Sequence, residues 1–169
     1  NVAITVTNVD EVGPTFSSSA TATGVNENSA ANTVVYTATA TDTDFNSPAT
    51  ANSITYSLKP GVGDVAKFSI GSTTGSVTLT ESPDFELKGS YSFTVVATDA
   101  ANNRSERVVT LAVNNVNEVP VNTVPGAQTV AEDTSLSITG LSVNDVDGNL
   151  ATTRLTVSNG SLSVSLAAG

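Results

Sequence analysis

The chain has 169 residues, no cysteine, no histidine and a formal net charge of −10. This charge excludes nucleic-acid binding through electrostatic attraction, because a phosphate backbone would be repelled. The lack of cysteine and histidine excludes disulfides, thiolate and imidazole metal sites, and the usual catalytic triads. No apolar run is long enough to span a membrane, and we expect no membrane contact by this segment.

An alternating apolar segment opens the chain and recurs later in it. The stretch VAITVTNVDEV begins at Val2, and VTLAVNNVNEV begins at Val109. Each alternating run is followed by a short cluster of acidic and amide residues, 8–12 in the first copy and 115–119 in the second, and then by a proline. We call each of these clusters a knot. Alternation over this length is typical of a half-buried strand. We therefore interpret residues 1–11 as the last strand and linker of a preceding module in a tandem array.

Seven short strands are predicted between the two knots, because β-branched residues alternate there between Gly, Pro and Asn. These strands span residues 21–25, 34–41, 54–58, 68–70, 76–80, 91–98 and 108–113. The glycines of IGSTTGSV indicate a hairpin turn. Seven strands in about one hundred residues are typical of a Greek-key β-sandwich. We expect the aromatic residues of these strands to pack in its core, namely Tyr36, Tyr56, Phe68, Tyr91 and Phe93.

A second unit begins after Pro120. In LTVSNGSLSVSL two alternating runs flank Asn159 and Gly160, a pair that strongly favours a two-residue hairpin. The unit is too short to close a sandwich of its own. We therefore predict that residues 12–118 form a complete module, and that residues 119–169 form the first half of a second one, either incomplete or split.

Acidic residues gather in tight pairs at the ends of the predicted strands. Outside the knots the clusters contain Glu27, Asp42, Asp44, Asp84, Glu86, Asp99, Glu132, Asp133, Asp145 and Asp147. A solvated acidic surface would instead alternate acids with lysines along the strands. Two carboxylates about 5 Å apart repel by about 3 kcal/mol at an effective dielectric constant near 20. Oxygen ligands without His or Cys favour a hard cation, and roughly six to eight of them suit calcium.

The order of these motifs resembles a cadherin-type repeat from Pro14 to Pro120. The resemblance is carried by PTF, VNEN, ATDTD, ITYSL, FSI, TGSVTL, PDFE, YSFTVVATDA and VVTLAVNNVNEVP. It implies an all-β fold of tandem Greek-key sandwiches, each with seven strands, and Ca²⁺ at the module junctions. It also implies that the partners of this segment are the adjacent modules of the same chain.

Carried over residue by residue, the resemblance implies two sets of metal ligands. The first set contains Asn8, Asp10, Glu11, Asp42, Asp44 and Asp99. The second set contains Glu27, Asp84, Glu86, Asn115, Asn117, Glu118, Asp145 and Asp147. Asn115 stands where the family usually has Asp, which removes one negative charge from the second set.

Two further features resemble bacterial proteins. The second knot has Val119 where animal cadherins have a second Asn, a shortened form similar to the cadherin-like repeats of large bacterial surface proteins. The second unit, with EDTSLSI, LSVNDVDG and LTVSNGSLSVSL, is similar to modules of RTX-type bacterial adhesins. In some of these adhesins a ligand-binding domain is inserted into a carrier sandwich.

Three functions are compatible with the sequence. The first is an extender segment, stiffened by calcium, of a large secreted adhesin on a bacterial cell surface, in which other domains bind the cell-surface or substratum ligand. The second is a lectin-like or peptide-binding module, or the carrier of an inserted ligand-binding domain. The third is a glycosidase with two catalytic carboxylates. We expect no enzyme, because the chain has no Trp to stack on sugars and its paired acids are explained as metal ligands.

Overall fold

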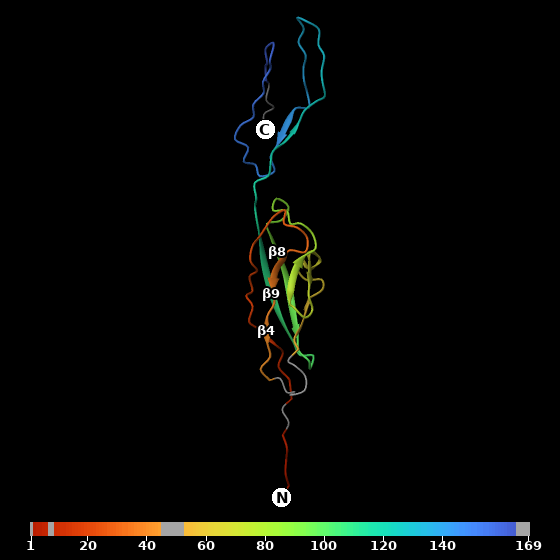
Figure 1. Cartoon of the computed structure of the whole chain (residues 1–169), viewed down its shortest axis with the longest axis vertical. Coiled ribbons are helices and arrows are strands. Elements are labelled where there is room, and N and C mark those ends of the chain that lie inside the picture. Colours follow the sequence, from red (N-terminus) through yellow and green to blue (C-terminus); the bar gives the residue numbers. More distant parts are fainter. Residues whose placement is uncertain (1, 7–8, 45–52, 165–169) are drawn as a thin grey trace. The chain divides into compact units, whose positions relative to one another are not determined.

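The structure is a computed structural model of the chain, and it describes residues 2–6, 9–44 and 53–164 (Figure 1). The chain divides into two units, Asn1–Val116 and Asn117–Gly169. Within the described ranges the regular elements are strands and one 3₁₀ turn, η1 (Val65–Lys67). The predicted all-β fold is therefore confirmed.

Most strands are short, and the two long ones pair with each other. The long strands are β8 (Ser90–Thr98) and β9 (Arg104–Asn114). The other strands of unit 1 are β1 (Thr15–Phe16), β2 (Val25–Asn26), β3 (Val34–Thr37), β4 (Ala40–Thr41), β5 (Thr55–Leu58), β6 (Phe68–Ile70) and β7 (Ser76–Leu79). The strands of unit 2 are β10 (Val121–Thr123) and β11 (Ser142–Asn144).

Unit 1 is a sandwich of two main sheets. One sheet has the order β2-β9-β8-β5 and the other the order β3-β7-β6, while β1 pairs with β4. The strands β8 and β9 are antiparallel from Ser90↔Ala112 to Thr98↔Arg104 and lie side by side in Figure 1. Consecutive strands such as β2 and β3, or β5 and β6, belong to different sheets, so the chain crosses repeatedly between the layers, as it does in a Greek key.

The core of unit 1 lies between these sheets. Every second residue of a strand faces the same side, and on β8 the inward residues include Phe93 and Val95, which are buried. The ring of Phe68 lies 4.5 Å from that of Phe93, measured between centroids. Four of the five aromatic residues predicted to pack in the core are buried, and Tyr56 is half-buried against them. The prediction of an aromatic core is confirmed.

Three predicted strands differ from the observed ones, and one of them, 108–113, begins four residues earlier in the structure as β9 (Arg104–Asn114). The predicted strand 34–41 is interrupted, because Ala38 and Thr39 belong to no strand and its two halves pair with different strands, β3 with β7 and β4 with β1. The predicted strand 21–25 is reduced to β2 and one isolated bridge at Thr21. By contrast, the predicted hairpin of β6 and β7 is confirmed, and Gly75 lies in its turn with φ +66°.

Side chains from both sheets hold the segment that follows β1. The guanidinium of Arg107 donates to the carbonyl oxygens of Ser18 and Phe16, and it lies 5.3 Å above the ring of Phe16. The hydroxyl of Tyr36 donates to the carbonyl oxygen of Ser19 at 2.6 Å. Because β1 has only two residues, these contacts add to the hydrogen bonds that the N–H groups of Ser17 and Ser18 donate to the carbonyl oxygen of Thr39.

In two places the sequence alternates between apolar and polar residues but forms no strand. Val2, Ile4 and Val6 are 85–90% exposed and belong to no strand. In unit 2, β10 and β11 pair from Val121↔Asn144 to Thr123↔Ser142, but the described residues around Asn159 and Gly160 form a bend without paired strands. The predicted hairpin there is wrong, since an isolated hairpin without a partner sheet to cover its apolar face is only marginally stable.

Candidate metal centre

The fold gathers four aspartates at one end of unit 1, and we call Asp10, Asp42, Asp44 and Asp99 the aspartate pole. Asp42 follows β4 directly, and Asp99 follows β8 directly. The strands β1 and β4 pair antiparallel, with Thr15 opposite Thr41. Residues before β1 therefore lie beside residues after β4, which brings Asp10 to the Asp-x-Asp pair.

The carboxylates of this pole lie close together. One oxygen from each of Asp10, Asp42 and Asp44 lies within 4.8 Å of the others, and all three residues are half-buried. Partial burial, the negative charge of Asp99 and that of Asp44 raise the pKa of Asp10 above its ordinary value, although a hydrogen bond from Asn103 opposes the rise. Partial burial, followed by the adjacent carboxyl of Asp44, likewise raises the pKa of Asp42. The pole is thus a concentration of mutually repelling charge.

Backbone donors hold Asp44 in its charged form. The N–H groups of Glu11 and Val12 donate to its Oδ2 at 3.1 and 3.0 Å, and its own N–H donates to Asp42 Oδ1 at 3.3 Å. Partial burial acts to raise the pKa of Asp44, but the N–H groups of Glu11 and Val12 and the hydrogen bond with the Asp42 carboxyl outweigh it, and the pKa is lowered. The hydrogen bonds also tie the segment before β1 to the residues after β4.

Asp99 is the most deeply placed member of the pole. The residue is 5% exposed, and its Oδ1 accepts the backbone N–H of Asn103 at 2.8 Å. Its Oδ2 is buried and has no hydrogen-bond partner among the described residues. A buried carboxylate oxygen without a donor is costly unless a cation or water satisfies it. This oxygen is the clearest sign that the pole binds a ligand.

The other end of unit 1 carries Glu27, Asp84, Glu86 and Asn115, which we call the glutamate pole. Glu27 follows β2 and is 4% exposed. Its Oε2 accepts the N–H of Phe85 at 2.9 Å, and its Oε1 accepts the N–H of Val116 at 2.7 Å. The Asn115 amide donates to Glu86 Oε1 at 2.8 Å, and the N–H of Leu87 donates to Asp84 Oδ1 at 2.8 Å. Here protein donors already satisfy several of the carboxylate oxygens.

Unit 2 repeats the hydrogen bonds of the aspartate pole. The N–H of Glu118 donates to Asp147 Oδ2 at 2.6 Å, as that of Glu11 donates to Asp44. The N–H of Asp147 donates to Asp145 Oδ1 at 3.1 Å, as that of Asp44 donates to Asp42. Asp147 Oδ1 is buried and has no hydrogen-bond partner in the described part of the chain. The sequence repeat is therefore also a repeat of local structure.

The remaining predicted ligands are placed as follows. Asn8 lies outside the described residues, and the side chain of Glu11 is exposed. Asn117 accepts the Asn149 amide at 2.6 Å, so both residues lie beside the Asp-x-Asp motif of unit 2. Sequence reasoning missed Asn103, which contacts both Asp10 and Asp99. Its one sequence signal is the Asn-Asn pair that follows the lone Asp.

The chemistry of the aspartate pole fits a hard divalent cation. It offers carboxylate oxygens and no nitrogen or sulfur ligand, which is the ligand type of calcium. A bound divalent cation would supply the positive charge that offsets the repulsion and would satisfy the buried oxygen of Asp99. The residues present are therefore those that a calcium site requires.

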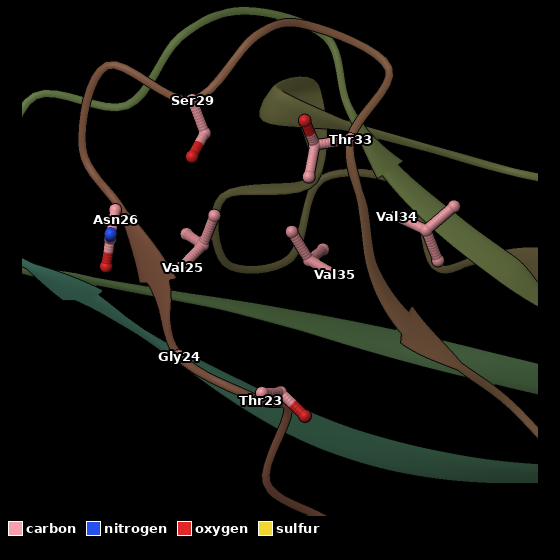
Figure 2. Close-up of a pocket in the computed structure, with 8 residues that line it drawn as sticks. All are labelled: Thr23, Gly24, Val25, Asn26, Ser29, Thr33, Val34 and Val35. Carbon is pink, nitrogen blue, oxygen red and sulfur yellow. The ribbon is translucent and has the colours of Figure 1, made fainter.

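A pocket of about 330 Å³ lies elsewhere in unit 1, between the edge strands β2 and β3. Figure 2 shows Val25 on one strand and Val35 on the other, with Ser29 on the loop that joins them. None of its eight lining residues is charged. Because Val25 and Val35 belong to the core, the pocket is a gap at the open edge of the sandwich, and none of its lining residues belongs to either acidic pole.

Comparison with known families identifies the class of protein. Residues 21–114, more than half of the chain, match the Cadherin domain. The chain therefore belongs to the cadherin domain family, a non-enzymatic adhesion fold whose members are extracellular and bind Ca²⁺. Comparison with curated protein sequences gives no match.

Solved structures of cadherins have a similar fold. Protocadherin Gamma B2 extracellular cadherin domains 1–5 are 23% identical, with a TM-score of 0.59, and the alignment covers 83% of this chain and 27% of that one. Drosophila N-cadherin EC1-3 is 29% identical with a TM-score of 0.51, covering 62% and 34%. Human Protocadherin-24 EC1-2 is 18% identical with a TM-score of 0.56, covering 80% and 60%. The chain thus spans only part of each of these structures. No helix within the described residues is long and apolar enough to cross a membrane.

Proposed function

We propose that this chain is an extender segment, stiffened by calcium, of a large secreted adhesin on a bacterial cell surface. Such a segment holds terminal binding domains away from the cell and has no chemistry of its own. The observation that carries the proposal is the aspartate pole, where three carboxylates lie within 4.8 Å and a buried oxygen of Asp99 has no donor among the described residues.

Calcium would bind to the aspartate pole through carboxylate oxygens from three separated parts of the chain. Asp10 precedes the sandwich, Asp42 and Asp44 follow β4, and Asp99 follows β8. An ion shared by these ligands resists bending of the segment before β1, because bending would remove oxygens from a divalent cation. The second ligand set, with Glu27, Asp84, Glu86, Asn115, Asn117, Glu118, Asp145 and Asp147, stays a prediction from the cadherin resemblance.

The bacterial assignment is supported by the sequence of the second knot and of unit 2. The knot Asn115–Val119 lacks the second Asn of animal cadherins. Unit 2 contains Ser/Thr-rich sequence similar to modules of RTX-type adhesins. Its Asp145 and Asp147 repeat the hydrogen bond between Asp42 and Asp44. A repeated structural element suits an array, in which each module presents the same ligands to its linker.

Thermal unfolding in chelator and in millimolar calcium tests the proposal. Any ion that binds only the folded chain stabilises it, by about 2.7 kcal/mol when its free concentration is 100 times the Kd. We expect a clear rise in Tm with calcium in the wild-type chain and a much smaller rise in the double variant Asp42→Asn, Asp44→Asn. Equal midpoints of the wild type in chelator and calcium would refute calcium binding.

Rigidity needs a separate measurement. Small-angle scattering of the same chain, in chelator and in calcium, reports its maximum dimension and flexibility. We expect a longer and less flexible particle in calcium. If calcium raises Tm without changing the scattering, the ion is structural only, and the extender mechanism fails although the metal site stands.

A further inference from the structure

Asn103 connects two members of the aspartate pole that are far apart in sequence. Its side-chain Nδ2 donates to both the carbonyl oxygen and the Oδ1 of Asp10, each at 3.0 Å. Its backbone N–H donates to Asp99 Oδ1 at 2.8 Å. The residue is half-buried and directly precedes β9. A single neutral side chain thus holds the segment before β1 against the end of the β8–β9 hairpin.

The segment before β1 lies tightly against this hairpin. A Cβ atom on Gly13 would meet the carbonyl oxygen of Arg104 at 2.7 Å, closer than real side chains approach. Asn103 is therefore not reaching across solvent to a distant loop. It makes its contacts at the point where residues 10–13 cross the start of β9.

The charges around Asp10 act against this arrangement. Partial burial and then the negative charges of Asp99 and Asp44 raise the pKa of Asp10, and Asp42 lies within the same cluster. A lysine or arginine at position 103 would also hold Asp10, but its positive charge would offset the negative charge of the pole that attracts a cation. An amide supplies two N–H bonds and leaves the negative charge of the pole intact.

We propose that Asn103 is a positioning residue that docks Asp10 at the aspartate pole before a cation binds. The proposal rests on the calcium function proposed above and adds a step to it: the pole is assembled in advance, so that the ion meets oriented ligands. Residues that orient metal ligands through hydrogen bonds typically contribute about 10-fold or more to metal affinity. Asn103 is not itself assigned as a ligand.

Hydrogen exchange of the Glu11 and Val12 amides provides the first test, because these N–H groups donate to Asp44 only while the segment is docked. The measurement is made on the full chain in chelator, where calcium plays no part. We expect both amides to be protected in the wild type and to exchange about 10-fold faster in Asn103→Ala, because losing the Asn103 hydrogen bonds makes local opening of the segment easier. Unchanged exchange in Asn103→Ala would overturn the proposal.

Calorimetric titration with calcium provides the second test. We expect about 10-fold weaker binding at the aspartate pole in Asn103→Ala, and equal affinity in both proteins would contradict the positioning role. If neither protein binds calcium, the proposed function fails, while the exchange experiment still decides whether Asn103 docks Asp10.

Two more variants separate positioning from general structural support. Asn103→Asp replaces the donor by a carboxylate, so in chelator it should release the segment, and saturating calcium should restore protection of Glu11 and Val12. A merely structural residue would not be rescued by the ion. Asn26→Ala removes a hydrogen bond of similar length beside the glutamate pole, the 3.0 Å bond that Asn114 Nδ2 donates to Asn26 Oδ1. It should leave the exchange of Glu11 and Val12 unchanged.

Discussion

The two poles of unit 1 solve the same electrostatic problem differently. At the aspartate pole, carboxylates crowd together, and one buried oxygen of Asp99 has no donor among the described residues. At the glutamate pole, Glu27 is equally buried, but backbone N–H groups satisfy both of its oxygens. One pole is therefore incomplete without a cation, whereas the other contains a carboxylate that the protein itself satisfies.

This difference indicates that the two predicted metal sites need not respond alike to removal of calcium. Glu27 connects β2, the loop at Phe85 and the segment after β9 through hydrogen bonds that do not involve an ion. Asp99 gains little from the protein beyond the N–H of Asn103. We expect the glutamate pole to support folding in chelator and the aspartate pole to oppose it.

The largest effect is expected at Glu27. Replacement by Ala removes the charged acceptor of the Phe85 and Val116 N–H groups, and the loss of these two hydrogen bonds should lower the free energy of unfolding by about 3 kcal/mol. Urea denaturation in chelator measures it. Glu27→Gln keeps the shape and one acceptor and should lose less. If Glu27→Ala unfolds at the same urea concentration as the wild type, the hydrogen bonds that Glu27 accepts do not stabilise the fold.

A smaller effect of opposite sign is expected at the aspartate pole. Asp99→Asn removes one of the clustered charges and keeps the Oδ1 that accepts from Asn103. In chelator we expect it to raise the free energy of unfolding by about 1 kcal/mol, because the repulsion of about 3 kcal/mol between charges 5 Å apart is partly screened by water and salt. In calcium the variant should lose most of the gain that the wild type shows. Thermal melts of both proteins in both buffers measure these differences. A variant that is less stable than the wild type in chelator would contradict the prediction.

The smallest effect concerns Asp64, a carboxylate of unit 1 outside both poles. Burial acts to raise its pKa, but the hydrogen bonds from Lys88 and from the N–H of Ser92 at 2.9 Å outweigh burial and lower the pKa below 3.8. A lowered pKa stabilises the folded state at pH values above 3.8, and this contribution is lost as the pH falls below it.

Asp64→Asn should therefore reduce stability by about 0.5–1 kcal/mol at pH 7 and by less at pH 3, as measured by denaturation at both pH values in chelator. A variant whose deficit is the same at both pH values would show that the charge of Asp64 is not what stabilises the fold.

The positions of the pole aspartates at strand ends could be predicted because their motifs are local. Asp42 and Asp44 are two residues apart at the end of a strand, and the lone Asp99 follows another, whereas their grouping at one end of the sandwich was implied by the cadherin resemblance. The hydrogen bonds of the Asn103 and Glu27 side chains could not be predicted, because they join groups 58 to 93 positions apart. Such contacts depend on which strands pair and not on any residue pattern.

The fold was predictable where the alternating pattern coincides with a paired and buried strand. The strands β6, β7 and β8 lie at or within one residue of their predicted positions. The segments at Val2 and around Asn159 alternate just as clearly but lack paired neighbours, so their apolar side chains stay exposed. An alternating pattern shows which apolar side chains a segment could bury. Whether they are buried depends on whether the segment pairs with a neighbouring strand.

The parallel pairing of β2 with β9 determines how unit 1 carries a tensile load. The two strands are in register at Val25↔Val113 and Asn26↔Asn114, and further bonds run from Ala22 to Thr110 at 2.8 Å and from Glu27 to Asn114 at 3.0 Å. A pull applied to the chain before β2 and after β9 slides parallel strands along each other. All the bonds between them are then strained together in shear instead of opening one after another like a zipper. Unit 1 should therefore resist stretching best along its own chain direction, which is the direction in which a tether is loaded.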